Sequence, residues 1–518
     1  MPTYLSPGVY VEEVEAGSRP IEGVGTAVAA FVGLAAQGPF NTPTLVTNWN
    51  QFTQTFGEFV EGSYLAHSVY GYFLNGGGAC YIVRIGGNGA PAGKGSTAKK
   101  KELPEGSSQA TLGGYRVSAL DSGTGHSPNI TVQVSDSGAE DAPEGSFKLV
   151  VKRGNKIEET FDPVTTTRGK DNVVTVVTER SKLIKIEEIA TGVLAKPEKT
   201  SVTLQPAAPP PPVPAQISAD DYVGDVAQRT GFGGLEAVDE ITMLSVPDLM
   251  SAYQQGVLDG EGVQAVQRAI IDHCELMGDR MAILDPPPGL NPQQIKEWRV
   301  ETTNYDSKYA ALYYPWPKVF DPSSGKNIFV PPSGHMAGIW ARNDDTRGVH
   351  KAPANEVIRG AIALETQITK AEHDQLNPIG VNCLRSFPGR GLRVWGARTL
   401  SSDPAWRYLN VRRLFNYLEE SILDGTQWVV FEPNDDALWA RIRRTISAFL
   451  VMEWRKGSLF GLTPDEAFYV KCDRETNPAE AIDVGQVLCE VGVAPVKPAE
   501  FVIFRLAQFS GGTSIVSE

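Results

Sequence analysis

Residues 64–84, YLAHSVYGYFLNGGGACYIVR, change from a helical pattern to a strand pattern across three glycines. The spacing of apolar residues predicts a helix over Tyr64–Leu74. The run Gly76–Gly78 ends that helix, because glycine adopts the left-handed conformation of a helix C-cap without steric cost. The short apolar run Cys80–Arg84 is typical of a buried strand. A helix followed directly by a buried strand indicates part of an α/β fold.

The same alternation is found on both sides of this stretch. Upstream, Val24–Leu34 predicts a strand of small apolar residues, and Trp49–Phe56 predicts a short helix. The pattern is interrupted after Gly86 and resumes near Ile217. From there the predicted strands are Ile241–Val246, Met281–Leu284 and Tyr309–Tyr314, and the predicted helices are Gly262–Leu276 and Pro292–Thr302.

The residues between Gly86 and Ile217, where the α/β pattern is interrupted, differ in composition from the rest. Residues 86–109 are rich in Gly, Ala, Ser and Lys, and Pro209–Pro212 forms a stiff proline run. Between these linkers the sequence predicts short strands, among them Ile130–Val134, Phe147–Lys152 and Val173–Val177. We therefore expect residues 90–216 to be an inserted, mostly β domain on the surface of a discontinuous α/β core.

The chain of 518 residues is long enough for several domains. We predict an N-terminal arm (residues 1–22), a core (23–89 with 217–386), an inserted domain (90–216), a C-terminal α/β domain (387–499) and a C-terminal arm (500–518). The fold class is thus multidomain α/β, with α+β character.

Both predicted arms contain a short β-prone run without a partner strand at hairpin distance. Val9-Tyr10-Val11 is the N-terminal run, and Phe501-Val502-Ile503-Phe504-Arg505-Leu506 is the C-terminal run. A single strand cannot satisfy its own backbone N–H and C=O groups. Each run must therefore pair with a distant strand or with another molecule.

One long helix is predicted over Asp436–Lys456. Its apolar residues Leu438, Ile442, Ile446, Phe449 and Leu450 share one face, and Arg441, Arg444 and Arg455 lie away from it. Residues 385–456 contain 12 Lys or Arg against 8 Asp or Glu, although the whole chain has a net charge of −14. The arginines form either a solvated helix face or a docking surface for an acidic partner.

Other features favour no catalytic, metal or cofactor site. Gly76–Gly78 follows a helix and precedes a strand, the reverse of a phosphate loop. The six histidines include no His-x-x-x-His pair, and the five cysteines include no Cys-x-x-Cys pair. Asp285, before three prolines, fits a turn as well as a strand-end carboxylate. The acidic net charge also argues against nucleic acid as a partner.

Four stretches resemble the phage tail sheath family. They are YLSPGVYVEE (residues 4–13), LNGGGACYIVR (74–84), VPPSGHMAGIWARNDDTRGVHKAPAN (330–355), and the pair CDRETN (472–477) with VAPVKPAEF (493–501). The resemblance covers both ends and the middle of the chain and leaves out residues 90–216.

This resemblance implies a noncatalytic subunit of a contractile sheath that stacks as rings around an inner tube. Terminal arms that exchange strands between subunits would then contain Val9–Val11 and Phe501–Leu506. The implied partners are further copies of the chain, the inner tube, and baseplate and terminal cap proteins, without membrane insertion. The setting is a phage tail or tail-like particle, assembled in the cytoplasm and released by lysis.

Two alternatives remain open from the sequence. One is another phage structural protein of the tube or baseplate, although tube proteins are usually shorter and mostly β. The other is an α/β hydrolase, which would have to use Asp285 or the region of His335. No Gly-x-Ser-x-Gly motif supports the hydrolase.

Overall fold

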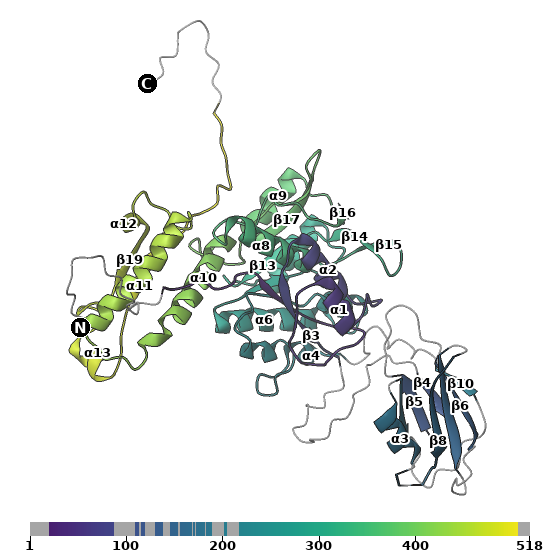
Figure 1. Cartoon of the computed structure of the whole chain (residues 1–518). Helices are drawn as coiled ribbons and strands as arrows, with labels where there is room; N and C mark the ends of the chain where they lie inside the picture. The colour runs from purple at the N-terminus through teal and green to yellow at the C-terminus, as the bar shows by residue number, and fades with distance from the viewer. Residues whose placement is uncertain are drawn as a thin grey trace, which may run out of the picture.

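The computed structural model describes residues 20–86, residues 217–505 and, with short gaps, residues 109–204. Figure 1 shows a large sheet with helices, a strand-rich unit and a helical unit near the C-terminal end of the chain. Each of these three units has its own cluster of buried apolar side chains.

The core is built on one eight-stranded sheet. Its strands are β1 (Val28–Gly33), β2 (Thr44–Val46), β3 (Ala79–Arg84), β11 (Met243–Ser245), β12 (Met281–Leu284), β13 (Ala310–Tyr314), β17 (Val381–Phe387) and β18 (Gly391–Val394). Their order is β18-β17-β13-β12-β11-β1-β3-β2. All neighbours from β17 to β3 are parallel, and β18 and β2 add antiparallel edges. The predicted α/β class is confirmed.

Helices cover both faces of this sheet. Every residue of β12 and β13 is buried. Because side chains alternate between faces, complete burial requires cover on both sides. The helices of the core are α1 (Trp49–Phe56), α2 (Leu65–Asn75), α4 (Ala219–Val223), α5 (Asp248–Gln254), α6 (Gly260–Met277), α7 (Pro292–Glu297), α8 (Ser333–Arg347) and α9 (Lys370–Leu376). A small antiparallel sheet of β14 (Pro317–Asp321), β15 (Lys326–Phe329) and β16 (Ala361–Leu364) is added to it.

Helices α2 and α8 contact each other through glycines. A Cβ atom on Gly338 would lie 2.4 Å from the Tyr72 carbonyl oxygen, and one on Gly334 would lie 2.4 Å from the Ser68 Cα. On α2, a Cβ on Gly71 would lie 2.7 Å from the His335 ring. These distances are too short for any Cβ, so the two backbones touch where side chains would otherwise separate them.

A buried carboxylate holds the start of α2. Asp248, at the first residue of α5, accepts hydrogen bonds from the backbone N–H groups of Leu34, Tyr64 and Leu65 and from the Ser63 hydroxyl. Burial raises the pKa of Asp248 to about 6, although these hydrogen bonds act in the opposite direction. This one side chain therefore links the end of β1 to the N-terminus of α2.

The described part of the predicted insertion is mostly β. It consists of β4 (Gln109–Leu112), β5 (Tyr115–Ala119), β6 (Ile130–Asp136), β7 (Phe147–Arg153), β8 (Lys156–Val164), β9 (Ile184–Glu188), β10 (Ser201–Thr203) and α3 (Val173–Arg180). The strands form two antiparallel sheets, β10-β6-β7-β8 and β4-β5-β9. Their inner side chains share one apolar cluster, so this unit has a core of its own.

The strand predicted over Val173–Val177 is wrong, because these residues begin helix α3. β-Branched residues favour strands, but the Asn172 side chain accepts hydrogen bonds from Val174 and Thr175 and caps a helix. Val173, Val176 and Val177 then share one helical face and are buried in the cluster of this unit. Capping and burial outweigh the local propensity.

The third unit contains α10 (Leu409–Thr426), α11 (Asp436–Arg455), α12 (Pro464–Ala467), α13 (Ala479–Asp483), β19 (Phe468–Lys471) and β20 (Glu490–Val493). The five apolar residues predicted on one face of α11 are all buried. Strand β18 lies beyond the predicted boundary at 386/387 and still belongs to the core sheet. The core thus continues past that boundary.

The α2–α8 contact predicts that adding one methyl group to α8 lowers the stability of the core. Gly338→Ala should destabilise the core by about 1–3 kcal/mol, since the methyl group meets backbone atoms that cannot move aside. Gly260→Ala is the control, because Gly260 also lies in a helix but has no atom within 4 Å of the place that a Cβ would occupy. Hydrogen exchange of α2 and α8 peptides measures the effect. Equal protection in both variants would contradict the close packing.

Candidate assembly interface

The C-terminal segment is held to the core at Glu500. Its carboxylate accepts hydrogen bonds from Arg398 at 2.9 and 2.6 Å and from the Asn377 side chain at 2.8 Å. The Tyr408 hydroxyl donates a longer bond of 3.3 Å. Partial burial raises the pKa of Glu500, but the bonds from Arg398 and Asn377 outweigh burial, so the net shift is downward. The ionised carboxylate therefore fixes where the segment leaves the core.

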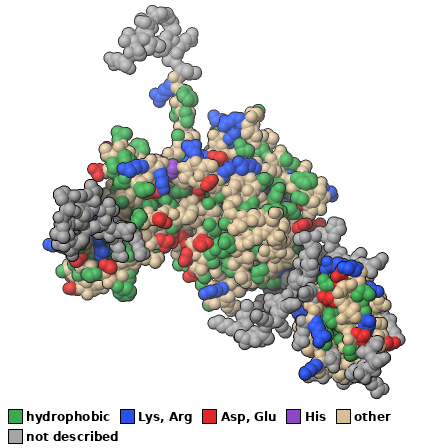
Figure 2. Space-filling model, in the orientation of Figure 1, with side chains coloured by type: hydrophobic (Ala, Val, Ile, Leu, Met, Phe, Trp, Pro, Cys, Tyr) green, Lys and Arg blue, Asp and Glu red, His purple; other side chains and the backbone are tan. Residues whose placement is uncertain are grey.

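Beyond Glu500 the segment makes little contact with the chain. Phe501, Val502, Ile503 and Phe504 are between 66% and 85% exposed. Residues 501–505 form no strand with the described residues, and Leu506 lies outside them. Figure 2 shows hydrophobic side chains unpacked along this extension. Four consecutive apolar residues in solvent indicate a surface that another molecule covers.

The other predicted arm strand, Val9–Val11, lies outside the described residues. The described residues that follow it contact the C-terminal unit. Ile21 is buried in the cluster of the C-terminal unit, and the Val24 N–H donates to the Ser421 hydroxyl on α10 at 3.1 Å. The described chain therefore begins against α10 before it enters β1.

A buried ion pair lies where this N-terminal segment, α8 and α10 meet. Arg413 of α10 and Asp344 of α8 are each only 4% exposed and pair through two hydrogen bonds, the shorter at 2.5 Å. Thr26 contributes its hydroxyl to Asp344 at 2.7 Å and its carbonyl to Arg413 at 3.0 Å. The Arg413 guanidinium also lies over the Trp340 ring. Removing either charge would leave the other buried and unpaired.

Strands β19 and β20 form a sheet of only two strands. In the part of the chain that the structure describes, neither has a third strand beside it. Tyr469 of β19 is 60% exposed, and Val491 of β20 is also exposed. Two-stranded sheets are marginally stable, and open strand edges bind further strands. This sheet is suited to accept a strand from another chain.

The arginines of α11 are not equivalent. Arg441 pairs with Glu432 at 2.7 Å and lies over the Trp428 ring. Arg444 and Arg455 are exposed, and neither has a charged partner among the described residues. Other arginines of residues 385–456 pair within the chain, as Arg398 does with Glu500. The local excess of positive charge is therefore partly neutralised by intramolecular partners that the sequence did not reveal.

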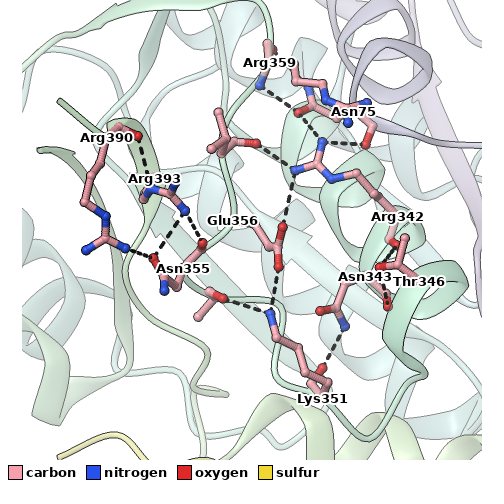
Figure 3. A network of polar contacts seen from close by, with 12 residues as sticks. Asn75, Arg342, Asn343, Thr346, Lys351, Asn355, Glu356, Arg359, Arg390 and Arg393 are labelled. Atoms are coloured by element: carbon pink, nitrogen blue, oxygen red, sulfur yellow. Dashed lines mark hydrogen bonds and ion pairs between the residues drawn. The ribbon is translucent and has the colours of Figure 1, made fainter.

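A polar network holds the loop that follows α8 (Figure 3). Arg342 of α8 donates to the Asn75 carbonyl at the end of α2 and faces Glu356. Arg393 of β18 donates to the Asn355 carbonyl at 2.6 Å. The loop is thus bonded to α2, to α8 and to an edge strand of the sheet. The network therefore ties the end of the 330–355 region to the core.

Asp285 and His335 are not arranged as a hydrolase site would need. Asp285 accepts hydrogen bonds from the Ser333 N–H at 2.8 Å and the Ser333 hydroxyl at 2.6 Å, and so caps α8. Burial raises the pKa of Asp285 to about 7 and lowers that of His335 to about 4. All three side chains are buried, so solvent and substrate do not reach them. The carboxylate is a helix cap, which fits the turn-type interpretation.

Two further findings concern other kinds of site. Across the described ranges, no three His, Cys, Asp or Glu side chains are grouped as metal ligands would be. In the same ranges, no helix has both the length and the apolar character needed to cross a membrane.

Comparisons with known proteins agree with this architecture. Residues 234–400 match the phage tail sheath protein central domain, and residues 401–509 match the phage tail sheath C-terminal domain. The chain is 24% identical to the tail sheath protein of Burkholderia phage BcepMu over 95% of this chain and 94% of that protein. It is 27% identical to the tail sheath protein of Vibrio phage KVP40, but this match spans only 44% of that longer protein.

Solved structures show the same fold. The sheath of the anti-feeding prophage in its contracted state has a TM-score of 0.59 and 23% identity, covering 98% of this chain and 100% of that one. The sheath complex of the extracellular contractile injection system PVC, also contracted, has a TM-score of 0.58 and 23% identity over 98% and 99% of the two chains.

Proposed function

This chain belongs to the phage tail sheath family, and we propose that it is the structural subunit of a contractile sheath. Such a subunit polymerises as stacked helical rings around an inner tube and contracts to drive that tube through a target envelope. The observation that carries the proposal is similarity of fold to contracted sheaths over 98% of the chain. The two matched family domains, which meet at residues 400 and 401, support it independently.

Subunits are linked in this proposal by donated strands. Phe501–Leu506 of one subunit, and Val9–Val11 of another, pair with the open edges of β19–β20 in neighbours. Phe501–Phe504 are exposed, and among the described residues no third strand lies beside β19–β20; these complementary features support this pairing. Each main-chain hydrogen bond contributes about 1 kcal/mol net, so one strand supplies only a few kcal/mol.

Because the arms link the subunits, the folded bodies of neighbouring subunits can move far relative to one another. Residues 1–22 could span roughly 70 Å when extended at about 3.3 Å per residue. The C-terminal arm is fixed to its own subunit at Glu500 and is exposed over Phe501–Phe504. Neighbouring bodies can therefore rotate and repack during contraction while the strand pairing between them persists.

The remaining surfaces are assigned from charge and exposure. Arg444 and Arg455, with Arg441 beside them, contact the inner tube, because a tube that must be released suits exchangeable charged contacts better than an apolar seal. The insertion at 90–216 lies on the outer side of the sheath, since it has its own core and long linkers. Baseplate and terminal cap proteins bind the two ends of the polymer, within a phage tail or tail-like particle.

Deleting residues 2–19 tests both the polymer and its arms. The deletion stops before Ile21, which is buried, so the body should fold and remain soluble. Purified wild-type protein should form striated hollow cylinders by electron microscopy, and the truncated protein should form none. Deleting residues 90–107, an equal length of predicted linker, is the control and should leave the cylinders intact.

Each alternative has its own outcome in this experiment. Smooth tubes from the wild type would indicate a tube protein, and absence of any polymer would argue against a sheath. Cylinders from the truncated protein as regular as those of the wild type would disprove the N-terminal strand donation while leaving the sheath assignment in place.

Reversing the charges of Arg444 and Arg455 tests the tube contact. The double variant to Glu should assemble on the inner tube poorly at low salt, because like charges then face an acidic surface. Folding should be unchanged, since both side chains are exposed. Arg268→Glu, at an exposed position of α6, is the matched control. Equal co-sedimentation of both variants with the tube would place the tube contact elsewhere.

A further inference from the structure

Two cysteines lie directly opposite each other at the end of the sheet β19–β20. In the register of this antiparallel pair, Lys471 is opposite Glu490. The next pair is therefore Cys472 and Cys489. Cys472 directly follows β19, and Cys489 directly precedes β20. The side chains of directly opposite residues lie on the same face of an antiparallel pair, so the two thiols share one face of the sheet.

The pair occupies the position in which a cross-strand disulfide fits. The Ala494 N–H donates to the Ala467 carbonyl at 2.8 Å, which marks Ala467 and Ala494 as a hydrogen-bonded pair. Such pairs alternate with non-hydrogen-bonded ones along an antiparallel ladder, which places Cys472 and Cys489 at a non-hydrogen-bonded position. There the Cβ atoms approach most closely, within the range that a disulfide spans.

The backbone around the pair agrees with this assignment. The Cys472 carbonyl faces away from Cys489 and accepts a hydrogen bond from Arg443 of α11. Asn477 donates to the Cys472 sulfur at 3.8 Å and exchanges hydrogen bonds of 2.6 and 3.0 Å with the backbone of Leu488. These contacts hold Cys472 and the segment between the two cysteines in place, so bond formation needs little movement.

The two thiols differ in access to solvent. Cys472 is buried, whereas Cys489 is partly exposed. Burial raises the pKa of both thiols, to about 12 for Cys489, so only a small fraction is ionised at neutral pH. Oxidation is therefore slow and begins at the sulfur that an oxidant can reach.

We propose that Cys472 and Cys489 are a redox pair that forms an intramolecular disulfide when the protein meets an oxidising small-molecule disulfide such as glutathione disulfide. The Cys489 thiol loses its proton and attacks one sulfur of glutathione disulfide, releasing one glutathione. The Cys472 thiol then loses its proton and attacks the Cys489 sulfur, releasing the second glutathione. Two electrons and two protons pass from the protein to glutathione.

The disulfide would link the end of β19 covalently to the start of β20. The linked chain is the segment between β19 and β20, which contains α13. Cross-linking this segment restricts the unfolded chain and so stabilises the fold of the C-terminal unit. The two-stranded sheet would thereby become harder to open, whether or not the chain is part of a sheath.

Thiol counting on the intact folded protein tests the proposal. The full-length chain is incubated with glutathione disulfide or with dithiothreitol, then denatured and alkylated for mass spectrometry. The reduced sample should carry alkyl groups on all five cysteines, and the oxidised sample should carry two fewer. Peptide mapping should link Cys472 to Cys489, and the oxidised wild type should melt at a higher temperature than the reduced one.

Variants identify the order of attack. Cys472→Ser should retain a glutathione adduct on Cys489, since the second thiol is missing. Cys489→Ser should remain unmodified, because Cys472 is buried. Cys383→Ser, which removes a buried core thiol, is the control and should form the disulfide normally. Five free thiols in the oxidised wild type, a persistent adduct on Cys489, or a different cysteine pair would each overturn the proposal.

Discussion

The close contact of α2 and α8 is the constraint on which the rest of the core depends. Gly334 and Gly338 bring the backbone of α8 against α2 with no room for a Cβ. The hydroxyl of Tyr72, a residue of α2, lies within hydrogen-bond distance of the carbonyls of Ala27 and Ala79, at the starts of β1 and β3. The helix pair thus fixes neighbouring strands, and buried aspartates cap both helices. This packing joins both helices and the sheet in one core.

Polar contacts connect this body to neighbouring parts of the chain. The ion pair of Arg413 with Asp344 links it to α10, and the bonds from Arg398 to Glu500 hold the C-terminal segment. From Phe501 to Phe504 the chain is exposed and apolar. A folded body with an exposed apolar segment at Phe501–Phe504 fits the proposal that cohesion resides in strands shared with neighbours. In that proposal, the bodies change position without losing the linkage.

Much of the core was predictable from the sequence because parallel strands and their helices have strong periodic patterns. The runs at Met281–Leu284 and Cys80–Arg84 are continuous apolar segments, which buried parallel strands require. Val173–Val177 was assigned wrongly because the Asn172 cap and tertiary burial override β-propensity. The partners of the arginines depend on residues far along the chain, as Arg398 and Glu500 show. The Cys472–Cys489 pair depends on strand register, which spacing alone does not reveal.

In the proposed polymer, cohesion depends on where the C-terminal strand binds. A cryo-electron microscopy reconstruction of the assembled polymer at side-chain resolution would show this directly. Strand donation predicts continuous density from Glu500 through Phe501–Leu506 to an edge of β19–β20 in a neighbouring subunit. The opposite result is a segment that folds back onto the sheet of its own subunit, or that has no ordered density in the polymer, and it would contradict strand donation as the source of cohesion.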